Sequence, residues 1–284
     1  PYTISIGAGI DSTLEIIPQI FSGDVIISDP DFPRFKEVGI RQNRHVIKIP
    51  RTGETFAFDD NCIDVILEKI TGEQKIFFIS TPNNPTGQLL PMHHIEKLAR
   101  KAQEGHLLVI DMAYGEFAGN DYVNRVINLA SRIENTIALL TFSKARGLAQ
   151  DVRIGYGISS AGIAHLIEKY RLPFIASGET RAIESIRRTE DLFEVVTETN
   201  DKRAYIKEIV GRRDGIAMVG NGSANIILIR GRDFDISGYL LRNGIKTVPH
   251  PWICDAKGNS LGYTRMTLGS WDAVRFAGTI LNQI

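Results

Sequence analysis

The sequence has little that would tie it to disulfide-stapled, zinc-binding or membrane-spanning proteins. Its 284 residues include only two cysteines, Cys62 and Cys254, which lie far apart and outside any C-x-x-C or Cys/His spacing, so neither a disulfide nor a zinc site is indicated. The neighbouring His93 and His94 should point to different faces of a helix, and we expect no metal site. No apolar run approaches the roughly 18 residues that cross a bilayer. A reducing cytoplasm is the expected location.

Net charge of either sign is also lacking, because 33 basic residues balance 33 acidic ones. This balance gives no electrostatic case for a nucleic acid or an anionic membrane as partner. Internal repeats, low-complexity segments and a signal peptide are absent as well. The sequence begins with Pro1 instead of methionine, from which we expect that an N-terminal segment is missing. The length suggests two domains with ample hydrophobic core.

Short apolar runs alternate with helical patterns through the first half of the chain. The expected strands are residues 24–28, 45–49, 75–79, 106–110 and 135–142, and the expected helices begin near residues 11, 33, 60 and 92. Such alternation predicts an α/β fold, a mostly parallel sheet sandwiched by helices. Ligands of such sheets bind outside the carboxyl ends of the strands.

The pattern changes after residue 160. Helical stretches at 161–170 and 180–213 precede short strands near 216–219, 225–230, 245–248 and 263–268, with helices at 236–242 and from 271 onwards. We therefore predict a large ligand-binding domain over residues 1–165. Residues 166–284 are predicted to form a linking helix and a smaller α+β C-terminal domain.

Lys144 stands at the end of the apolar run 135–142, in the segment Thr141-Phe142-Ser143-Lys144. A lysine that leaves a buried strand is expected to be desolvated, which lowers the pKa of the ammonium group and leaves a nucleophilic amine. A Schiff-base lysine needs such an amine. The alternative is an ordinary surface lysine in a turn, because short motifs often match by chance.

Two loops rich in glycine, asparagine and proline are further candidates for a ligand site. Residues 7–11 (GAGID) open a helix, where free N–H groups favour an anion and glycine lets the backbone approach it. Residues 81–87 (TPNNPTG) follow the strand 75–79. Each loop also has an ordinary interpretation, a glycine-rich helix start or a common turn.

Two charged residues complete the pattern. Asp111 follows the strand 106–110 directly, and an acid in that position costs desolvation free energy unless a cation faces it. The protonated pyridine nitrogen of a cofactor would be such a partner, and a helix N-cap is the alternative. Arg153 follows the lysine loop and can hold a phosphate in a bidentate fork, unless it is a solvated surface residue.

These segments, in this order, resemble those of the fold-type I pyridoxal 5'-phosphate enzymes, specifically the class I/II aminotransferases. Among these, the sequence motifs and their order are most similar to those of the histidinol-phosphate aminotransferase group. The resemblance extends from Gly7 to the final helix. It implies pyridoxal 5'-phosphate as cofactor, an amino acid and a 2-oxo acid as substrates, and a homodimer whose active site lies at the subunit interface.

The resemblance also implies roles for individual residues. Lys144 resembles the Schiff-base lysine that later carries the substrate proton, and Asp111 the acid that keeps the pyridine nitrogen protonated. Tyr114 and Asn84 correspond to the pair that hydrogen bonds to the phenolate oxygen, and Phe32 to the aromatic that stacks on the ring. The positions similar to the family's phosphate-binding cup are Ala8, Gly9, Thr141, Ser143 and Arg153.

Three positions are similar to those that bind the substrate. Arg265, in residues 263–269 (YTRMTLG), resembles the arginine that clamps the α-carboxylate, a task that suits a planar bidentate group. Asn225 resembles a second carboxylate contact, and Asn84 is placed against both cofactor and substrate.

The chain departs from the family pattern at two places. Arg153 lies one residue further from Lys144 than the usual spacing, so Arg146 is a conceivable substitute. Val248 stands where histidinol-phosphate aminotransferases usually carry an arginine that faces the substrate phosphate. A desolvated phosphate needs cationic partners, and neither Lys246 nor His250 matches that position. We therefore expect a substrate without a phosphate group.

The leading functional hypothesis is an aminotransferase with a ping-pong mechanism. A decarboxylase or lyase on the same scaffold, similar to threonine-phosphate decarboxylases, stays an alternative, because the sequence does not show which bond to Cα is broken. A non-catalytic sensor domain of a transcription regulator is the third hypothesis.

Overall fold

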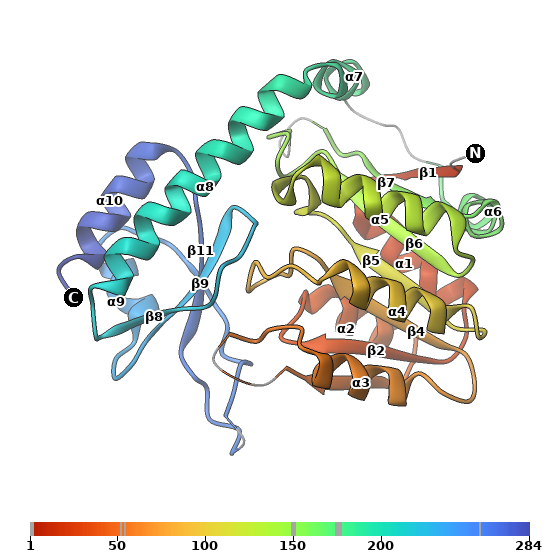
Figure 1. Ribbon diagram of the computed structural model, residues 1–284, viewed down its shortest axis with the longest axis horizontal. Coiled ribbons are helices and arrows are strands. Elements are labelled where there is room, and N and C mark those ends of the chain that lie inside the picture. Colours follow the sequence, from red (N-terminus) through yellow and green to blue (C-terminus); the bar gives the residue numbers. More distant parts are fainter. Residues whose placement is uncertain (1–2, 52, 54, 149–151, 174–177, 256) are drawn as a thin grey trace.

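Two separate β-sheets organise the chain in the computed structural model, which describes residues 3–51, 53, 55–148, 152–173, 178–255 and 257–284 (Figure 1). The larger sheet has seven strands in the order β1-β7-β6-β5-β4-β2-β3. The pairs β3–β2, β2–β4, β4–β5 and β5–β6 are parallel, whereas β7 runs antiparallel to both β6 and β1. The strands are β1 (Thr3–Gly7), β2 (Asp24–Asp29), β3 (Val46–Pro50), β4 (Lys75–Ser80), β5 (Leu107–Asp111), β6 (Thr136–Thr141) and β7 (Gly155–Ser159).

Helices cover both faces of this sheet. In Figure 1, α3 (Asp60–Lys69), α4 (Met92–Ala102) and α5 (Asn120–Arg132) lie in front of the strands. The opposite face packs against α1 (Ile10–Ile20), α2 (Pro33–Arg41) and α6 (Ala161–Tyr170). This two-sided cover explains why the central strands read as continuous apolar runs, with every residue of β5 and β6 buried.

Strand β4 shows how the sequence builds the two hydrophobic layers. Successive side chains of a strand point to opposite faces. Phe77 and Ile79 accordingly join the core under α3 and α4, and Ile76 and Phe78 join the core under α1 and α2. Each of these side chains is at most 1% exposed, and burial of one such side chain contributes about 1.5–3 kcal/mol. The cores fix the positions of the strand ends, from which the loops depart.

The smaller sheet is antiparallel, in the order β10-β11-β9-β8. Its strands are β8 (Ile216–Met218), β9 (Ile226–Gly231), β10 (Val248–Pro249) and β11 (Tyr263–Thr267). It packs with α9 (Ile236–Arg242), α10 (Trp271–Leu281) and the second half of α8 (Thr189–Gly211) around one apolar core. Helix α7 (Glu179–Arg187) precedes α8, which runs from the side of the large sheet to the small one (Figure 1).

The predicted α/β class is confirmed, with a parallel-dominated sheet between helices and a smaller second sheet. Two expected elements were wrong in detail. The helix expected over residues 180–213 is two helices, because the backbone at Arg188 is not helical. The strand expected at 245–248 is reduced to Val248–Pro249. Strands β1 and β7 and helix α5 were not predicted. The division into residues 1–165 and 166–284 stays a prediction.

Within the described residues, no helix combines the length and the apolar character needed to cross a bilayer.

Candidate active site

A cavity of about 230 Å³ lies where the carboxyl ends of three neighbouring parallel strands meet. Ser80, Asp111 and Thr141 are the last residues of β4, β5 and β6, and side chains at these ends gather at one edge of the sheet. The predicted site residues in the cavity wall are Gly9, Phe32, Asn84, Asp111, Tyr114, Thr141, Ser143, Lys144, Arg153 and Arg265. Ala8 and Asn225 are not among the lining residues.

Asp111 is a buried acid without an ionic partner at hydrogen-bond distance in the described part of the chain. Its Oδ1 accepts a hydrogen bond from the backbone N–H of Ala113 at 2.8 Å. Burial raises the pKa of Asp111 to about 7; this backbone hydrogen bond opposes the rise, and the negative charges of Asp31 and Asp11 add to it. A cation that enters the cavity beside this carboxyl would therefore be held strongly.

Lys144 faces the ring of Tyr114 across the cavity, with Nζ 5.2 Å from the ring centroid. Both residues line the cavity together with Asp111. However, Lys144 is exposed, so the burial from which we argued in the sequence analysis is wrong. The chain leaves β6 at Thr141 and turns before Lys144, with the N–H of Ser143 bonded to the Thr141 hydroxyl at 3.2 Å. This turn carries the amine out of the sheet to the rim of the cavity.

One end of the cavity combines a helix start with a guanidinium group. Gly9 precedes α1 with a φ of 74°, a conformation that glycine adopts without strain. A Cβ atom at Gly9 would lie 3.6 Å from Nη2 of Arg153. Gly155, at the start of β7, packs so closely that a Cβ atom there would lie 2.4 Å from the carbonyl carbon of Gly9. The free N–H groups of a helix start together with an arginine form a site for an anion.

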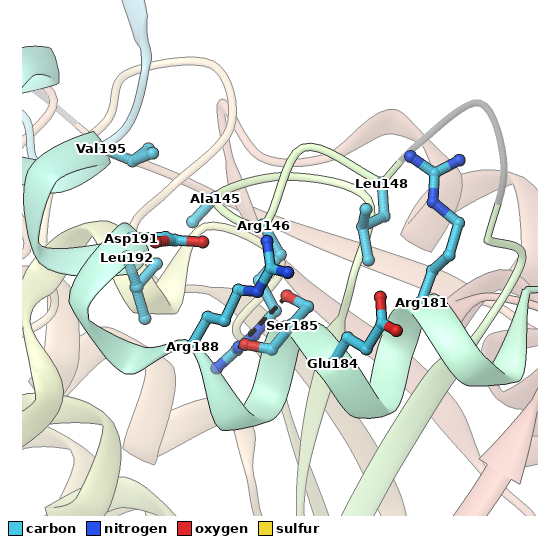
Figure 2. Close-up of a pocket in the computed structure, with 10 residues that line it drawn as sticks. All are labelled: Ala145, Arg146, Leu148, Arg181, Glu184, Ser185, Arg188, Asp191, Leu192 and Val195. Carbon is cyan, nitrogen blue, oxygen red and sulfur yellow. Dashed lines mark hydrogen bonds between the residues drawn. The ribbon is translucent and has the colours of Figure 1, made fainter.

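Arg146 does not take the place of Arg153 in this cavity. Its Nε donates to Glu116 at 2.6 Å and its Nη1 to the carbonyl of Ser185 at 2.5 Å. Figure 2 shows Arg146 in a second cavity of about 230 Å³, where it reaches Ser185 on α7. The substitution that we considered from the sequence is therefore not supported by the geometry, and Arg153 remains the arginine at the helix start.

The small sheet contributes Arg265, a residue of β11, to the same cavity. Its Nη1 donates to Oδ1 of Asn84 at 2.7 Å, while its Nε is buried without a partner among the described residues. Asn225 lies next to β9, half-buried, and its Oδ1 also has no partner among those residues. The preceding loop meets the 81–87 loop through a hydrogen bond from Ser223 N–H to the Gly87 carbonyl at 2.8 Å.

Val248 is paired in register with Arg265 across the antiparallel strands β10 and β11. Directly opposite residues of such a pair project from the same face of the sheet, and Val248 is half-exposed there. His250 is buried with Nδ1 2.7 Å from the Val248 carbonyl, and burial lowers the pKa of His250 to about 4. The imidazole is therefore neutral at physiological pH and supplies no charge beside Val248.

Four cavity residues were not predicted from the sequence: Ile10, Asp11, Ser80 and Ala113. The position of Ser80 gave a usable signal, because it is the first polar residue after the apolar run of β4. Asp31 and Arg51 were missed as well. Both are buried charged residues beneath the cavity loops, and no local pattern connects them.

Asp60, His93 and His94 form a group apart from the cavity whose ligand atoms lie within 4.8 Å of one another. His93 is exposed and His94 buried, yet their rings are in contact at 4.0 Å between centroids. Asp60 accepts from His94 at 2.9 Å and lies 3.6 Å from the ammonium of Lys97. The carboxylate thus already has a cationic neighbour, which weakens its attraction for a metal ion.

Residues 1–235 match the sequence profile of the family described as aminotransferase class I and II. The chain belongs to this aminotransferase family. A histidinol-phosphate aminotransferase of Thermococcus kodakarensis is 29% identical over 273 residues, which are 94% of this chain and 72% of the relative. The family assignment confirms the predicted enzyme class and its cofactor, pyridoxal 5'-phosphate.

Solved structures agree with this aminotransferase fold. The histidinol-phosphate aminotransferase of Clostridium acetobutylicum superposes with a TM-score of 0.84 at 20% identity, covering 99% of this chain and 83% of its own. The enzyme of that name from Sinorhizobium meliloti, solved in complex with pyridoxal 5'-phosphate, has a TM-score of 0.81 at 24% identity and covers 99% and 76%.

The cavity of this aminotransferase fits the cofactor on three separate observations. Asp111 offers a buried carboxyl that lacks a cation, which a pyridine N–H would satisfy. Gly9 and Arg153 face one another where an anion such as a phosphate would bind. Lys144 and Tyr114 lie in the cavity wall that they share with Asp111. A ring, a phosphate and a reactive aldehyde therefore each find a suitable partner.

Proposed function

We propose that this chain transfers an amino group between an amino acid and a 2-oxo acid, with Lys144 as the reactive amine. The single observation that carries this proposal is the convergence of Lys144, Asp111, Arg153 and Arg265 on one cavity. Lys144 and Arg153 come from the connection between β6 and β7, Asp111 is the last residue of β5, and Arg265 lies in β11 of the small sheet. Together they offer an amine, an acid, an anion site and a second guanidinium.

Pyridoxal 5'-phosphate, when bound, supplies an electron sink that stabilises negative charge at the substrate Cα. Asp111 would hold a proton on the ring nitrogen, because its buried carboxylate is stabilised by a cation beside it. Arg153 and the N-terminus of α1 would hold the phosphate. Phe32, which lines the cavity, would contribute an aromatic surface that excludes water.

The amine of Lys144 would accept the proton from the substrate Cα and hold it for return during the reaction. This role requires a flexible side chain at the cavity wall, and Lys144 lies there. Arg265 orients the substrate by its carboxylate, since it lines the same cavity and still has an unpartnered Nε–H among the described residues. Asn225, which directly precedes β9, offers as a second contact a side-chain oxygen that has no partner among the described residues.

The proposed amino donor carries no phosphate. Arg265 fixes the carboxylate, and the residue that projects beside it is the half-exposed Val248. His250 is neutral and turned to a backbone carbonyl. An apolar neighbour of this kind does not compensate a desolvated phosphate. We therefore propose an amino acid with an uncharged side chain as substrate, although the relatives are called histidinol-phosphate aminotransferases.

A half-reaction screen tests the function directly. The purified protein loaded with pyridoxal 5'-phosphate is mixed with single amino acids, and the conversion of the cofactor to its amine form is followed by absorbance. Reduction with borohydride followed by peptide mass spectrometry should locate the cofactor on Lys144, and Lys144→Ala should lose both the label and turnover. Label on another lysine would refute the assignment. Release of ammonia or carbon dioxide without a 2-oxo acid would instead indicate a lyase or a decarboxylase.

We further propose a cytoplasmic homodimer with active sites at the interface. Apolar side chains are exposed on β1, α7 and α8, namely Ile4, Ile6, Ile183, Ile186 and Phe193. Exposed apolar side chains can form part of protein interfaces. Light scattering coupled to gel filtration should give the mass of two chains, and the double variant Ile183→Lys/Ile186→Lys should give one.

A further inference from the structure

Phe32 and Asn84 lie on two different loops of the cavity, residues 29–33 and 81–87, and one buried carboxyl connects them. We propose that Asp31 is a positioning residue that locks these two loops together and thereby sets how tightly the cofactor is held. The inference rests on the proposed function, because it concerns the same cavity. Asp31 itself is not a lining residue of that cavity.

Asp31 is 5% exposed and acts only as an acceptor. Its Oδ1 accepts from the backbone N–H of Phe32 at 2.8 Å and from the hydroxyl of Ser80. Its Oδ2 accepts from the hydroxyl of Ser28 at 2.6 Å. The backbone N–H of Ser80 also lies 3.5 Å from Oδ2, so four donors converge on this carboxyl group. Hydrogen bonds of this kind favour the ionised form of the carboxyl group.

Ser80 passes this constraint on to the second loop. The single hydroxyl proton of Ser80 is donated to Asp31, so both lone pairs of the hydroxyl oxygen are free to accept. They receive the backbone N–H of Asn84 at 3.1 Å and the side-chain amide of Asn83, also at 3.1 Å. The charge on Asp31 therefore fixes the orientation of the Ser80 hydroxyl, and this orientation fixes the backbone at Asn84.

Arg51 connects the same two loops by hydrogen bonds. It is 3% exposed, and its guanidinium donates to the carbonyl of Pro30 in the first loop and to Oδ1 of Asn83 in the second, the latter at 2.9 Å. A third hydrogen bond reaches the Phe56 carbonyl at 2.7 Å. Asp31 and Arg51 are thus opposite buried charges that help to connect the 29–33 and 81–87 loops. Removal of either charge leaves the other uncompensated.

Electrostatics couples this unit to the acid of the cofactor site. Burial raises the pKa of Asp31 to about 6, and the positive charge of Arg51 opposes the rise, so Asp31 is ionised at neutral pH. Its negative charge is one of the causes that raise the pKa of Asp111. A positive ring nitrogen beside Asp111 would therefore be stabilised by the negative charges of both Asp111 and Asp31.

The constraint also reaches the substrate side of the cavity. Asn84, whose backbone Ser80 holds, accepts at its Oδ1 the hydrogen bond from Arg265. A loosened 81–87 loop would move this acceptor and with it the guanidinium that receives the substrate carboxylate. The role of Asp31 thus predicts a change in substrate KM beside the change in cofactor affinity, a combination that simple loss of stability would not give.

The test compares Asp31→Asn, which keeps the size and removes the charge, with Ser80→Ala, which removes only the relay. Asp29→Asn is the matched control, because Asp29 is in the same turn but pairs with Lys48 at the protein surface. Binding of pyridoxal 5'-phosphate to the apo-proteins is measured by equilibrium titration, together with the KM of the amino donor at saturating cofactor. Asp31→Asn should weaken cofactor binding roughly 10-fold, as expected for lost hydrogen bonds to a charged group.

Ser80→Ala should weaken cofactor binding and raise KM in the same direction, and Asp29→Asn should stay within about twofold of the unmodified chain. Wild-type cofactor affinity in Asp31→Asn would overturn the inference. If that variant fails to fold, Asp31→Asn/Arg51→Met removes both charges, and wild-type affinity in the double variant would have the same consequence. Failure of the unmodified chain to bind pyridoxal 5'-phosphate would refute the proposed function instead.

Discussion

Replacement of Asp111 by asparagine should make the apo-protein more stable and the cofactor complex weaker. In the folded chain the carboxyl of Asp111 has a pKa of about 7, against 3.8 for an ordinary aspartate, chiefly because it is buried. The folded state therefore binds this proton more tightly than the unfolded state. The resulting stabilisation is complete below pH 3.8 and is lost as the pH rises to about 7. The asparagine side chain of the variant has no proton to lose, so its contribution does not change with pH.

The magnitude follows from the two pKa values. Each pH unit between them corresponds to about 1.36 kcal/mol, so the ionised carboxyl costs at most about 4 kcal/mol at pH 8. Entry of water and relaxation around the charge reduce this figure. We expect Asp111→Asn to gain about 2–4 kcal/mol of unfolding free energy relative to the unmodified apo-protein when the pH is raised from 4 to 8.

Urea unfolding of both apo-proteins at several pH values measures this difference, with Asp201→Asn on the exposed side of α8 as the control. The control should unfold like the unmodified protein, because an exposed side chain without buried contacts contributes little to stability. Addition of pyridoxal 5'-phosphate should reverse the order, since a ligand stabilises only the protein that binds it. If Asp111→Asn gains no stability between pH 4 and 8, the carboxyl does not carry an uncompensated charge and the electrostatic account of the site is wrong.

Three further substitutions address other parts of the structure. Gly155→Ala should destabilise the fold by about 2–4 kcal/mol in urea unfolding and weaken cofactor binding, because the new Cβ would lie 2.4 Å from the backbone of Gly9; a wild-type unfolding midpoint would contradict the close approach. Arg265→Lys should raise the KM of the amino donor about 10-fold, since an ammonium cannot hold a carboxylate bidentately; an unchanged KM would remove Arg265 from substrate binding. Tyr122→Phe should cost about 1–3 kcal/mol in the same unfolding assay, because its partly buried hydroxyl donates to the Leu90 carbonyl at 2.7 Å; a variant as stable as the parent would show that water replaces this bond.

The sequence was most informative where a candidate site residue follows an apolar strand. Asp111 and Thr141 end β5 and β6, so the continuous apolar runs before them located both at the same edge of the sheet. The sequence correctly placed Lys144 in the loop after β6, at the cavity, but the predicted burial of its side chain was wrong. Its position after β6 follows from the strand, whereas its exposure depends on the turn that begins at Thr141, which the local sequence does not specify.

Features that depend on distant pairs were not predictable from the sequence. Strand β7 contains two glycines among its five residues, so it lacks the apolar signal of a strand, and the close packing of Gly155 on Gly9 becomes visible only in the fold. Asp31 and Arg51 likewise look like surface residues in a turn and after a strand. Their burial follows from the way in which the 81–87 loop closes over them.

The hydrogen bond between Arg265 and Asn84 ties the small sheet to the large one before any substrate arrives. The guanidinium group of Arg265 is therefore already ordered in the folded protein. The carboxylate of the proposed substrate would not have to immobilise it on binding. When the proposed substrate binds, its carboxylate would replace the Asn84 amide oxygen as acceptor for Arg265, and the Asn84 side chain would be free to contact the substrate. Affinity for the proposed amino-acid substrate would then depend on this existing order as well as on the number of contacts.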